Sequence, residues 1–286
     1  MLNKAFIQIA DYIKSVDLEK LNIHLKKCND IFKSYINDIN DINDINLNII
    51  GIISEEKESI QYIKNKSNKV DNYIIALKSL DGVDNMLSNI TFGSIYCLYK
   101  YDTEKEEIIS IEKAGYCIYG LNTFLIETNN GKLELYKLEK ESFVFKKNIN
   151  FQKKQNIYSI NEAYSYSPEI TNLIRCYKMK NYKQRWIGTM IADCHRILLN
   201  DGIFFYPPTN DISDLKISLY YQAYPLAYIF ELAGGIGLDS NYNKLLDKLK
   251  GSNFKNIHFR TSVILCSIEK YNELIEITDL YEANRY

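Results

Sequence analysis

Short, almost uninterrupted apolar runs restrict the possible folds of this chain more than any other feature. The clearest are NIIGIIS (48–54), VDNYIIALKSL (70–80) and VILCSI (263–268). Runs of this length that are rich in β-branched residues are typical of strands buried in a sheet, and they are too short to span a membrane. Because helical patterns lie between and around them, the sequence predicts a mixed α/β protein.

The first 46 residues contain no strand-like run. Apolar residues at helical spacing predict two helices within residues 1–36. The tract that follows, NDINDINDIN (37–46), has regularly spaced acidic residues like a calcium loop, but it lacks the glycine turn and the closing glutamate. We therefore expect this tract to be a solvated loop.

The character of the chain changes near residue 150. Further strands are expected at 90–100 and within 113–146, with a turn at 128–131. Beyond residue 150, helices are expected at 167–178, where Pro168 lies in the first turn, at 188–200, at 224–233 and after the strand at 263–268. The sequence thus predicts two α/β halves in tandem, residues 1–150 and 151–286.

Charge and cysteine content argue against several classes of protein. With 35 basic and 36 acidic residues the net charge is −1, so no overall field favours nucleic acid or an anionic membrane. No apolar run has the length of a membrane span, and the first residues lack the apolar centre of a signal peptide, so we expect a cytoplasmic protein. Six scattered cysteines without a CxxC pair are expected to be reduced and mostly buried.

Carboxylates follow two of the expected strands. Glu55 and Glu56 come after the run at 48–54, and Asp81 comes after the run at 70–80. Acidic side chains at neighbouring strand ends can converge on a divalent cation, although carboxylates in such places are more often simply solvated. Spacing alone therefore gives only a weak indication of a metal site.

Four ordered motifs in the second half give a more specific indication. The segments SINEAY (159–164), RWIGTMIADCHR (185–196), DGIFFYPP (201–208) and YPLAYIFELAGG (224–235) resemble motifs of the fructose-1,6-bisphosphatase family, as do KAGYCIYG (113–120), ISEE (53–56) and LDG (80–82). The resemblance implies the sugar-phosphatase fold, two stacked α/β halves in an αβαβα arrangement. It also implies a Mg²⁺-dependent phosphoric monoester hydrolase of gluconeogenesis and carbohydrate metabolism, usually a homodimer or homotetramer.

The same resemblance implies a sugar-phosphate pocket, and its residues are largely kept. Arg185 would reach into the pocket of a neighbouring subunit, and Trp186 stands where the family has a tyrosine. A guanidinium fork, amide and phenol donors, and an ammonium group suit the oxygens of a phosphate. The residues carried over from the family are Asn161, Tyr164, Arg185, Trp186, Tyr206 and Lys216.

The metal ligands implied by the resemblance are kept only in part. Glu55, Glu56 and Asp81 match the family, whereas Lys78 and Gln222 stand where it has an aspartate and a glutamate. The pair that would orient the attacking water falls on Glu19 and Leu25. Two serines that follow the LDG segment become Val83 and Asp84, and a basic residue becomes Ser218.

These substitutions predict a member of the family that binds a sugar phosphate or a similar anion, with hydrolysis of the 1-phosphate lost or strongly impaired. A lysine among carboxylates repels divalent ions, and a glutamine offers only a neutral carbonyl, so Mg²⁺ binding is expected to be weak or absent. In this interpretation Lys78 stands in for a metal ion and pairs with Glu55 or Asp81. Two alternatives stay open: an active fructose-1,6-bisphosphatase with a rearranged site, and a structural oligomer without a ligand.

Overall fold

An eight-stranded sheet forms the first half of the chain. The computed structural model describes residues 2–15, 21–41, 47–63, 71–152, 154–210 and 215–283. The strand order is β2-β1-β3-β4-β5-β6-β7-β8, with β1 and β3 parallel and the other neighbours antiparallel. The strands are β1 (Asn48–Ser54), β2 (Gln61–Tyr62), β3 (Asn72–Asp81), β4 (Phe92–Asp102), β5 (Glu107–Tyr119), β6 (Phe124–Asn129), β7 (Lys132–Glu139) and β8 (Ser142–Asn148).

The expected strands and turn of this half are confirmed. All seven residues of β1 are buried, as are eight of the ten in β3, which explains the continuous apolar runs. The turn between β6 and β7 has Asn130 at φ 47° and Gly131 at φ 71°. Two consecutive positive φ angles are typical of the two-residue hairpin turn whose twist matches that of the flanking strands.

Two helices, α1 (Asn3–Ser15) and α2 (Leu21–Asp41), cover one face of this sheet. Phe6 of α1 and Phe32 of α2 pack edge to face in a core that also includes Tyr96 of β4. The expectation that residues 37–46 form a loop is wrong for 37–41, which belong to α2; residues 42–46 lie outside the described residues. Phe32 and Ile36 bury one face of α2 against the sheet, and this packing favours continuing the helix.

The second half contains a five-stranded sheet in the order β10-β9-β11-β15-β13, and a small ribbon of β12 and β14. The strands β10, β9 and β11 run parallel, while β15 runs antiparallel to both of its neighbours. The strands are β9 (Ile157–Ser159), β10 (Lys183–Gln184), β11 (Ile203–Tyr206), β12 (Ile217–Ser218), β13 (Gly235–Leu238), β14 (Arg260–Thr261) and β15 (Val263–Ser267).

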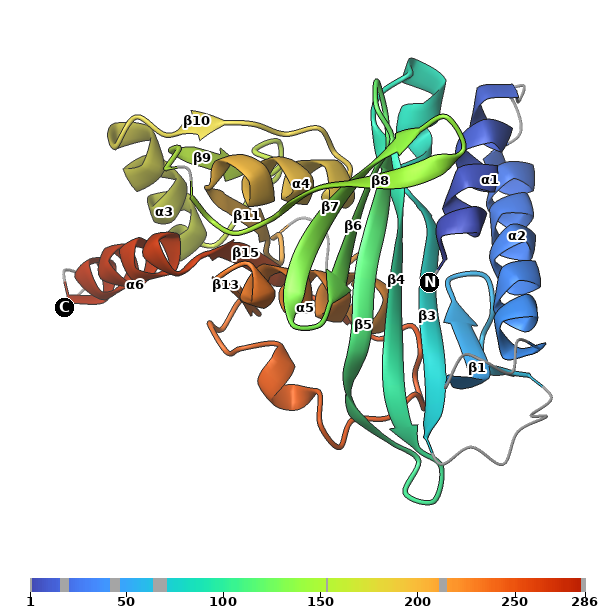
Figure 1. Ribbon diagram of the computed structural model, residues 1–286. Helices are drawn as coiled ribbons and strands as arrows, with labels where there is room; N and C mark the ends of the chain where they lie inside the picture. The colour runs from blue at the N-terminus through green and yellow to red at the C-terminus, as the bar shows by residue number, and fades with distance from the viewer. Residues whose placement is uncertain are drawn as a thin grey trace.

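Helices and sheets alternate in five layers (Figure 1). The helices α4 (Met190–Asn200) and α5 (Tyr224–Leu232) lie between the two sheets, while α3 (Pro168–Met179) and α6 (Ile268–Ala283) pack on the outer face of the second. One core joins Ile95 and Tyr116 of the first sheet to Phe204 of the second and Phe230 of α5. The layered αβαβα fold predicted from the sequence is confirmed.

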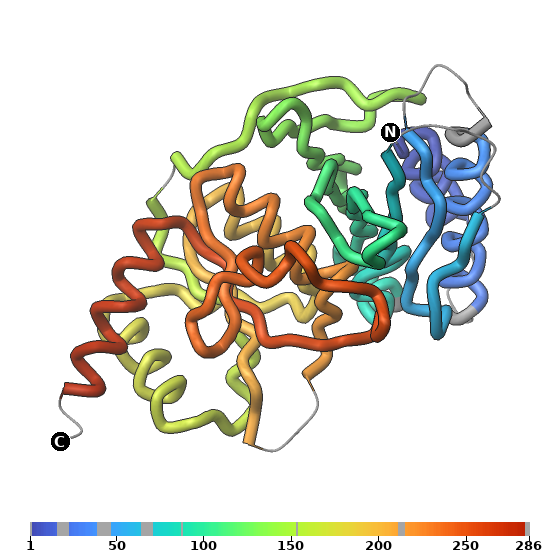
Figure 2. Tube along the Cα trace, turned by 90° about the horizontal axis from the view of Figure 1, so that it is seen from below, coloured from blue at the N-terminus to red at the C-terminus, as the bar shows by residue number. Residues whose placement is uncertain are grey.

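The segment between β13 and β15 returns from the second half to the first (Figure 2). It bonds to β5, where the Ile108 N–H donates to the Ser252 carbonyl at 2.8 Å and the Gly251 N–H donates to the Ile108 carbonyl at 3.1 Å. The end of this segment enters β14 beside β12. The two sheets are therefore connected by backbone hydrogen bonds as well as by packing.

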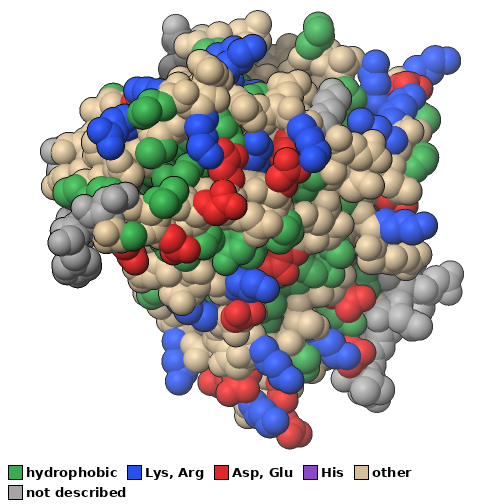
Figure 3. Space-filling view, turned by 90° about the vertical axis from the view of Figure 1, so that its left-hand side faces the viewer, with side chains coloured by type: hydrophobic (Ala, Val, Ile, Leu, Met, Phe, Trp, Pro, Cys, Tyr) green, Lys and Arg blue, Asp and Glu red, His purple; other side chains and the backbone are tan. Residues whose placement is uncertain are grey.

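The cysteines, and the charge pattern on one face of the surface, agree with the expectations from composition. On the face that carries α3 and α6, basic and acidic side chains are interspersed with apolar ones (Figure 3). All six cysteines are free and five of them are buried. In the part of the chain that the structure describes, no helix combines the length and the apolar character that crossing a bilayer requires.

Candidate functional site

A pocket opens at the carboxyl ends of the three parallel strands of the second sheet. Asn161 follows β9, Trp186 follows β10 and Tyr206 ends β11. Lys216, directly before β12, also lines this pocket. Ligands of open α/β sheets bind outside the carboxyl ends of the strands, so the location favours a binding site.

Aromatic residues and a fixed loop shape this pocket. The Trp186 indole stacks on Phe204, with ring centroids 6.3 Å apart and planes at 12°. The Tyr166 hydroxyl donates to the Asn161 carbonyl at 2.6 Å, and the Asn161 side chain accepts from the Ala163 N–H at 3.1 Å. Burial raises the pKa of Tyr206, so its phenol keeps its proton at neutral pH and can donate a hydrogen bond.

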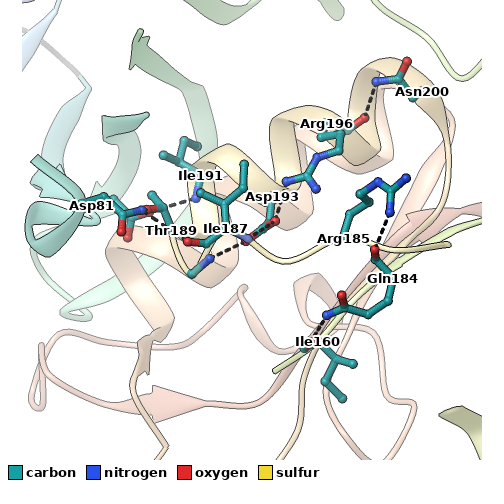
Figure 4. A network of polar contacts seen from close by, with 12 residues as sticks. Asp81, Ile160, Gln184, Arg185, Ile187, Thr189, Ile191, Asp193, Arg196 and Asn200 are labelled. Atoms are coloured by element: carbon teal, nitrogen blue, oxygen red, sulfur yellow. Dashed lines mark hydrogen bonds and ion pairs between the residues drawn. The ribbon is translucent and has the colours of Figure 1, made fainter. Parts of the chain in front are cut away.

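Five of the six predicted sugar-phosphate residues line the pocket, and Arg185 does not. Arg185 is exposed, and its Nη1 donates to the Gln184 carbonyl at 2.8 Å. Figure 4 shows it turned toward that carbonyl, away from Asp81. Its predicted place is the pocket of a neighbouring subunit, which a single chain does not contain, so its role stays a prediction.

Each oxygen of the Asp81 carboxylate, at the end of β3, accepts a hydrogen bond. Its Oδ2 accepts from the Ile191 N–H in the first turn of α4 at 2.9 Å (Figure 4), and its Oδ1 accepts from Gln222 Nε2 at 2.9 Å. Gln222 lies in the π-helical turn η2 (Leu219–Ala223), and its Oε1 accepts from the Ser218 N–H at 3.1 Å. Asp81 therefore links β3 to α4 and to the segment that leads from the pocket.

The electrostatics of Asp81 follow from its surroundings. Burial raises the pKa of this carboxyl, while the Lys78 ammonium group, the Ile191 N–H and the Gln222 amide oppose the rise. The donors thus compensate part of the cost of burying a carboxylate.

Lys78 pairs with Glu55 at the neighbouring strand end. The Lys78 ammonium group forms an ion pair with the Glu55 carboxylate, and the two side chains are 13% and 46% exposed. Glu56 is exposed in the turn after β1. A half-buried cation thus pairs with one of the carboxylates that a metal would need as a negative oxygen ligand.

The residues present do not fit a divalent metal ion. Hard cations select several anionic oxygens, but Glu55 is neutralised by Lys78 and both oxygens of Asp81 are bonded to N–H donors. The Gln222 carbonyl is also occupied, by the Ser218 N–H. Over the described ranges, no group of three or more His, Cys, Asp or Glu side chains is arranged to hold a metal.

The other residues that the sequence singled out lie apart from this cluster. Leu25 is half-buried and packs in the core beneath α1 and α2, and Glu19 lies outside the described residues. Asp84 is exposed in the short turn η1 (Val83–Ser88).

Gly82, directly before this turn, has φ 79°, and a Cβ there would overlap the Thr189 side chain. The close approach of the turn to α4 therefore requires glycine.

Asp193 is a positioning residue that the sequence reasoning missed. Its carboxylate accepts from the backbone N–H groups of Ile187 and Gly188 at 3.1 Å and from Arg196 Nη2 at 2.7 Å (Figure 4). These bonds hold the loop that presents Trp186 to the pocket. The available signal was an acidic residue in the first turn of a helix, where exposed N–H groups attract carboxylates.

Known proteins that are similar to this chain are fructose-1,6-bisphosphatases. The sequence model described as "Fructose-1-6-bisphosphatase, C-terminal domain" matches residues 151–279. The class 1 fructose-1,6-bisphosphatase of Cytophaga hutchinsonii is 32% identical over 246 residues, which cover 78% of this chain and 70% of that protein. Fructose-1,6-bisphosphatase isozyme 2 of Bos taurus is 30% identical over 249 residues, which cover 81% of this chain and 71% of that protein.

The fold comparison covers nearly the whole chain. The apo crystal structure of Leishmania major fructose-1,6-bisphosphatase superposes with a TM-score of 0.81 and 27% sequence identity. The match covers 96% of this chain and 90% of that one. The likeness therefore includes both sheets and the helices between them.

Proposed function

Since this chain belongs to the fructose-1,6-bisphosphatase family, we propose that it binds a sugar phosphate in the pocket at β9, β10 and β11 but does not hydrolyse it. The ligand-binding half of the site keeps the donors that a phosphate needs, namely Asn161, Tyr164, Tyr206 and Lys216. The half that would hold metal ions is occupied by protein contacts.

The observation that carries this proposal is the pair of contacts at the strand ends, Lys78 with Glu55 and Gln222 with Asp81. Metal-assisted phosphoryl transfer to water depends on cations that neutralise the attacking and leaving oxygens. Two unit charges about 4 Å apart interact by about 4 kcal/mol at an effective dielectric near 20, and a divalent ion doubles the repulsion by a lysine. Mg²⁺ therefore binds weakly, and turnover is lost.

The alternative of an active phosphatase rests on Glu55 and Glu56. Both carboxylates are exposed, so a cation could reach them from solvent without displacing Asp81. Such a site would have fewer ligands than hard divalent ions prefer. Phosphate release from fructose 1,6-bisphosphate in the presence of Mg²⁺ or Mn²⁺ distinguishes it from the proposal.

Calorimetric titration with fructose 1,6-bisphosphate in excess EDTA tests the proposal. We expect one site per chain with a Kd below about 1 mM, and no phosphate release when Mg²⁺ is supplied. Lys216→Gln should weaken binding about 10-fold, because it removes a charge-assisted hydrogen bond, while Lys132→Gln on β7 should not. A folded protein that gives no binding heat, or one that releases phosphate rapidly with Mg²⁺, would refute it.

We also propose a homodimer in which Arg185 contacts the pocket of the partner subunit. Its guanidinium is exposed and, in the part of the chain described, bonds only to the Gln184 carbonyl. Light scattering should give at least twice the mass of one chain. The mass of a single chain at micromolar concentration would contradict this assembly.

A further inference from the structure

A second pocket lies between α3 and the loop that follows β9, on the outer side of the second sheet (Figure 1). Its volume of about 420 Å³ is within the range of small-molecule sites. We call it the α3 pocket. It shares the side chains of Tyr164 and Tyr166 with the pocket at β9, β10 and β11, and its other lining residues are different.

Packing and backbone hydrogen bonds fix the walls of the α3 pocket. Tyr166 is buried in the core of the second half, and Tyr164 and Ile174 pack against the same core. The Asn210 N–H donates to the Ser165 carbonyl at 2.9 Å, which ties the loop to the segment after β11. A ligand would therefore enter a largely preformed cavity, with little loss of conformational entropy in the protein.

Arg175 supplies an available cation in this pocket. Its Nη2 donates to Asn172 Oδ1 at 2.8 Å on the same helix, and in the part of the chain that the structure describes no carboxylate forms an ion pair with it. A guanidinium has five N–H donors, so most of them remain available to a ligand. The planar fork of these donors matches the oxygens of a carboxylate or a phosphate.

The acidic residue in the described walls, Glu162, does not cancel this charge. Its Oε1 accepts from the Tyr158 hydroxyl at 2.6 Å, and its Oε2 forms an ion pair with Lys178, which also lines the pocket. One neutralised pair and one guanidinium are thus the charged groups of these walls. Together with the phenol and apolar side chains beside them, they favour a small organic anion as the ligand.

We propose that the α3 pocket binds a small organic anion, whose carboxylate or phosphate group is held by Arg175, and that this anion regulates the neighbouring pocket at β9, β10 and β11. The site itself is independent of the proposed function. The regulation rests on it, because it assumes a sugar phosphate in that neighbouring pocket. Both ligands carry negative charge and would contact Tyr164 and Tyr166, so each should weaken the binding of the other.

Calorimetry in excess EDTA with succinate and with glycerol 3-phosphate tests the site and distinguishes a carboxylate ligand from a phosphate ligand. We expect at least one of the two to bind with a Kd below about 1 mM. Arg175→Gln should weaken this binding at least about 10-fold, because charge-assisted hydrogen bonds are lost. Thr171→Phe, which fills the cavity without changing its charge, should also abolish binding. Lys132→Gln on β7 removes a positive charge elsewhere and should bind like the unchanged protein.

The inference is overturned if the folded protein binds neither anion, or if Arg175→Gln binds as tightly as the unchanged protein. Binding that is lost in Arg175→Gln but kept in Thr171→Phe would also overturn it, because the anion would then meet only an exposed charge outside the cavity. Both residues are exposed, so both variants should fold. If Arg175→Gln does not fold, Arg175→Lys decides: it keeps the charge but not the fork, and unchanged affinity would overturn the inference.

The regulation is measured separately, at constant ionic strength. Saturation with the anion that binds should weaken the binding of fructose 6-phosphate about 2- to 5-fold in the unchanged protein, and not in Arg175→Gln. Equal affinity for fructose 6-phosphate with and without the anion would refute the regulation. A protein that binds succinate or glycerol 3-phosphate in the α3 pocket but no sugar phosphate would refute the proposed function and support the site.

Discussion

Replacing Lys78 with aspartate and Gln222 with glutamate together is expected to create a divalent-metal site. The double variant removes an ammonium group from between the strand ends and adds two carboxylates, one near Glu55 and one near Asp81. Clusters of anionic oxygens are what Mg²⁺ and Mn²⁺ select. We expect Mn²⁺ affinity to rise at least about 100-fold, equivalent to about 2.8 kcal/mol, measured by calorimetry.

A charge-matched control separates geometry from overall charge. Lys132→Asp combined with Gln8→Glu changes the net charge by the same amount, at exposed positions on β7 and α1. This control should bind Mn²⁺ no better than the unchanged protein. Equal Mn²⁺ affinity in both double variants would show that the added negative charge alone is responsible. A folded Lys78→Asp/Gln222→Glu protein that binds no Mn²⁺ would refute the claim that Lys78 and Gln222 prevent metal binding.

Phe230→Ala is expected to cause the largest loss of stability. Phe230 is fully buried in α5, within the core that the two sheets share. Truncating such a side chain removes its burial energy and leaves a cavity, typically at a cost of about 3–5 kcal/mol. Phe145→Ala, the same change at a residue 49% exposed on the edge strand β8, should cost less than about 1 kcal/mol.

Urea unfolding can follow this loss with two probes. Trp186 is the only tryptophan and lies in the second half, whereas far-UV circular dichroism reports both sheets. Because residues 1–150 and 151–286 share one core, the two signals should change together, and Phe230→Ala should shift both equally. Separate transitions, or a loss below about 1 kcal/mol, would contradict a common core.

Local patterns in the sequence predicted the elements well where burial is uniform. The runs of β1 and β3 and the turn at Asn130 and Gly131 each follow from short-range chemistry. The end of α2 was missed because the polar tract suggested solvent, although Ile36 is buried against the sheet. Tertiary packing decided that boundary.

The site depended on the family resemblance rather than on periodicity. Asn161, Trp186, Tyr206 and Lys216 come from four separate segments, and no spacing rule brings them together. The pairing of Gln222 with Asp81 depends on the register between strands and on a π-helical turn. Sequence patterns carry little information about such long-range register.

Titration of the unchanged protein with Mn²⁺, followed by electron paramagnetic resonance of the free ion, tests the central claim most directly. Because Lys78 repels the ion and both oxygens of Asp81 are hydrogen-bonded, Mn²⁺ should stay free in solution. The signal of the free ion should then rise in proportion to the added metal up to about 1 mM. The result should be the same with fructose 1,6-bisphosphate in slight excess over protein. Loss of one or two equivalents of signal per chain at micromolar concentration would show that the carboxylates still form a metal site.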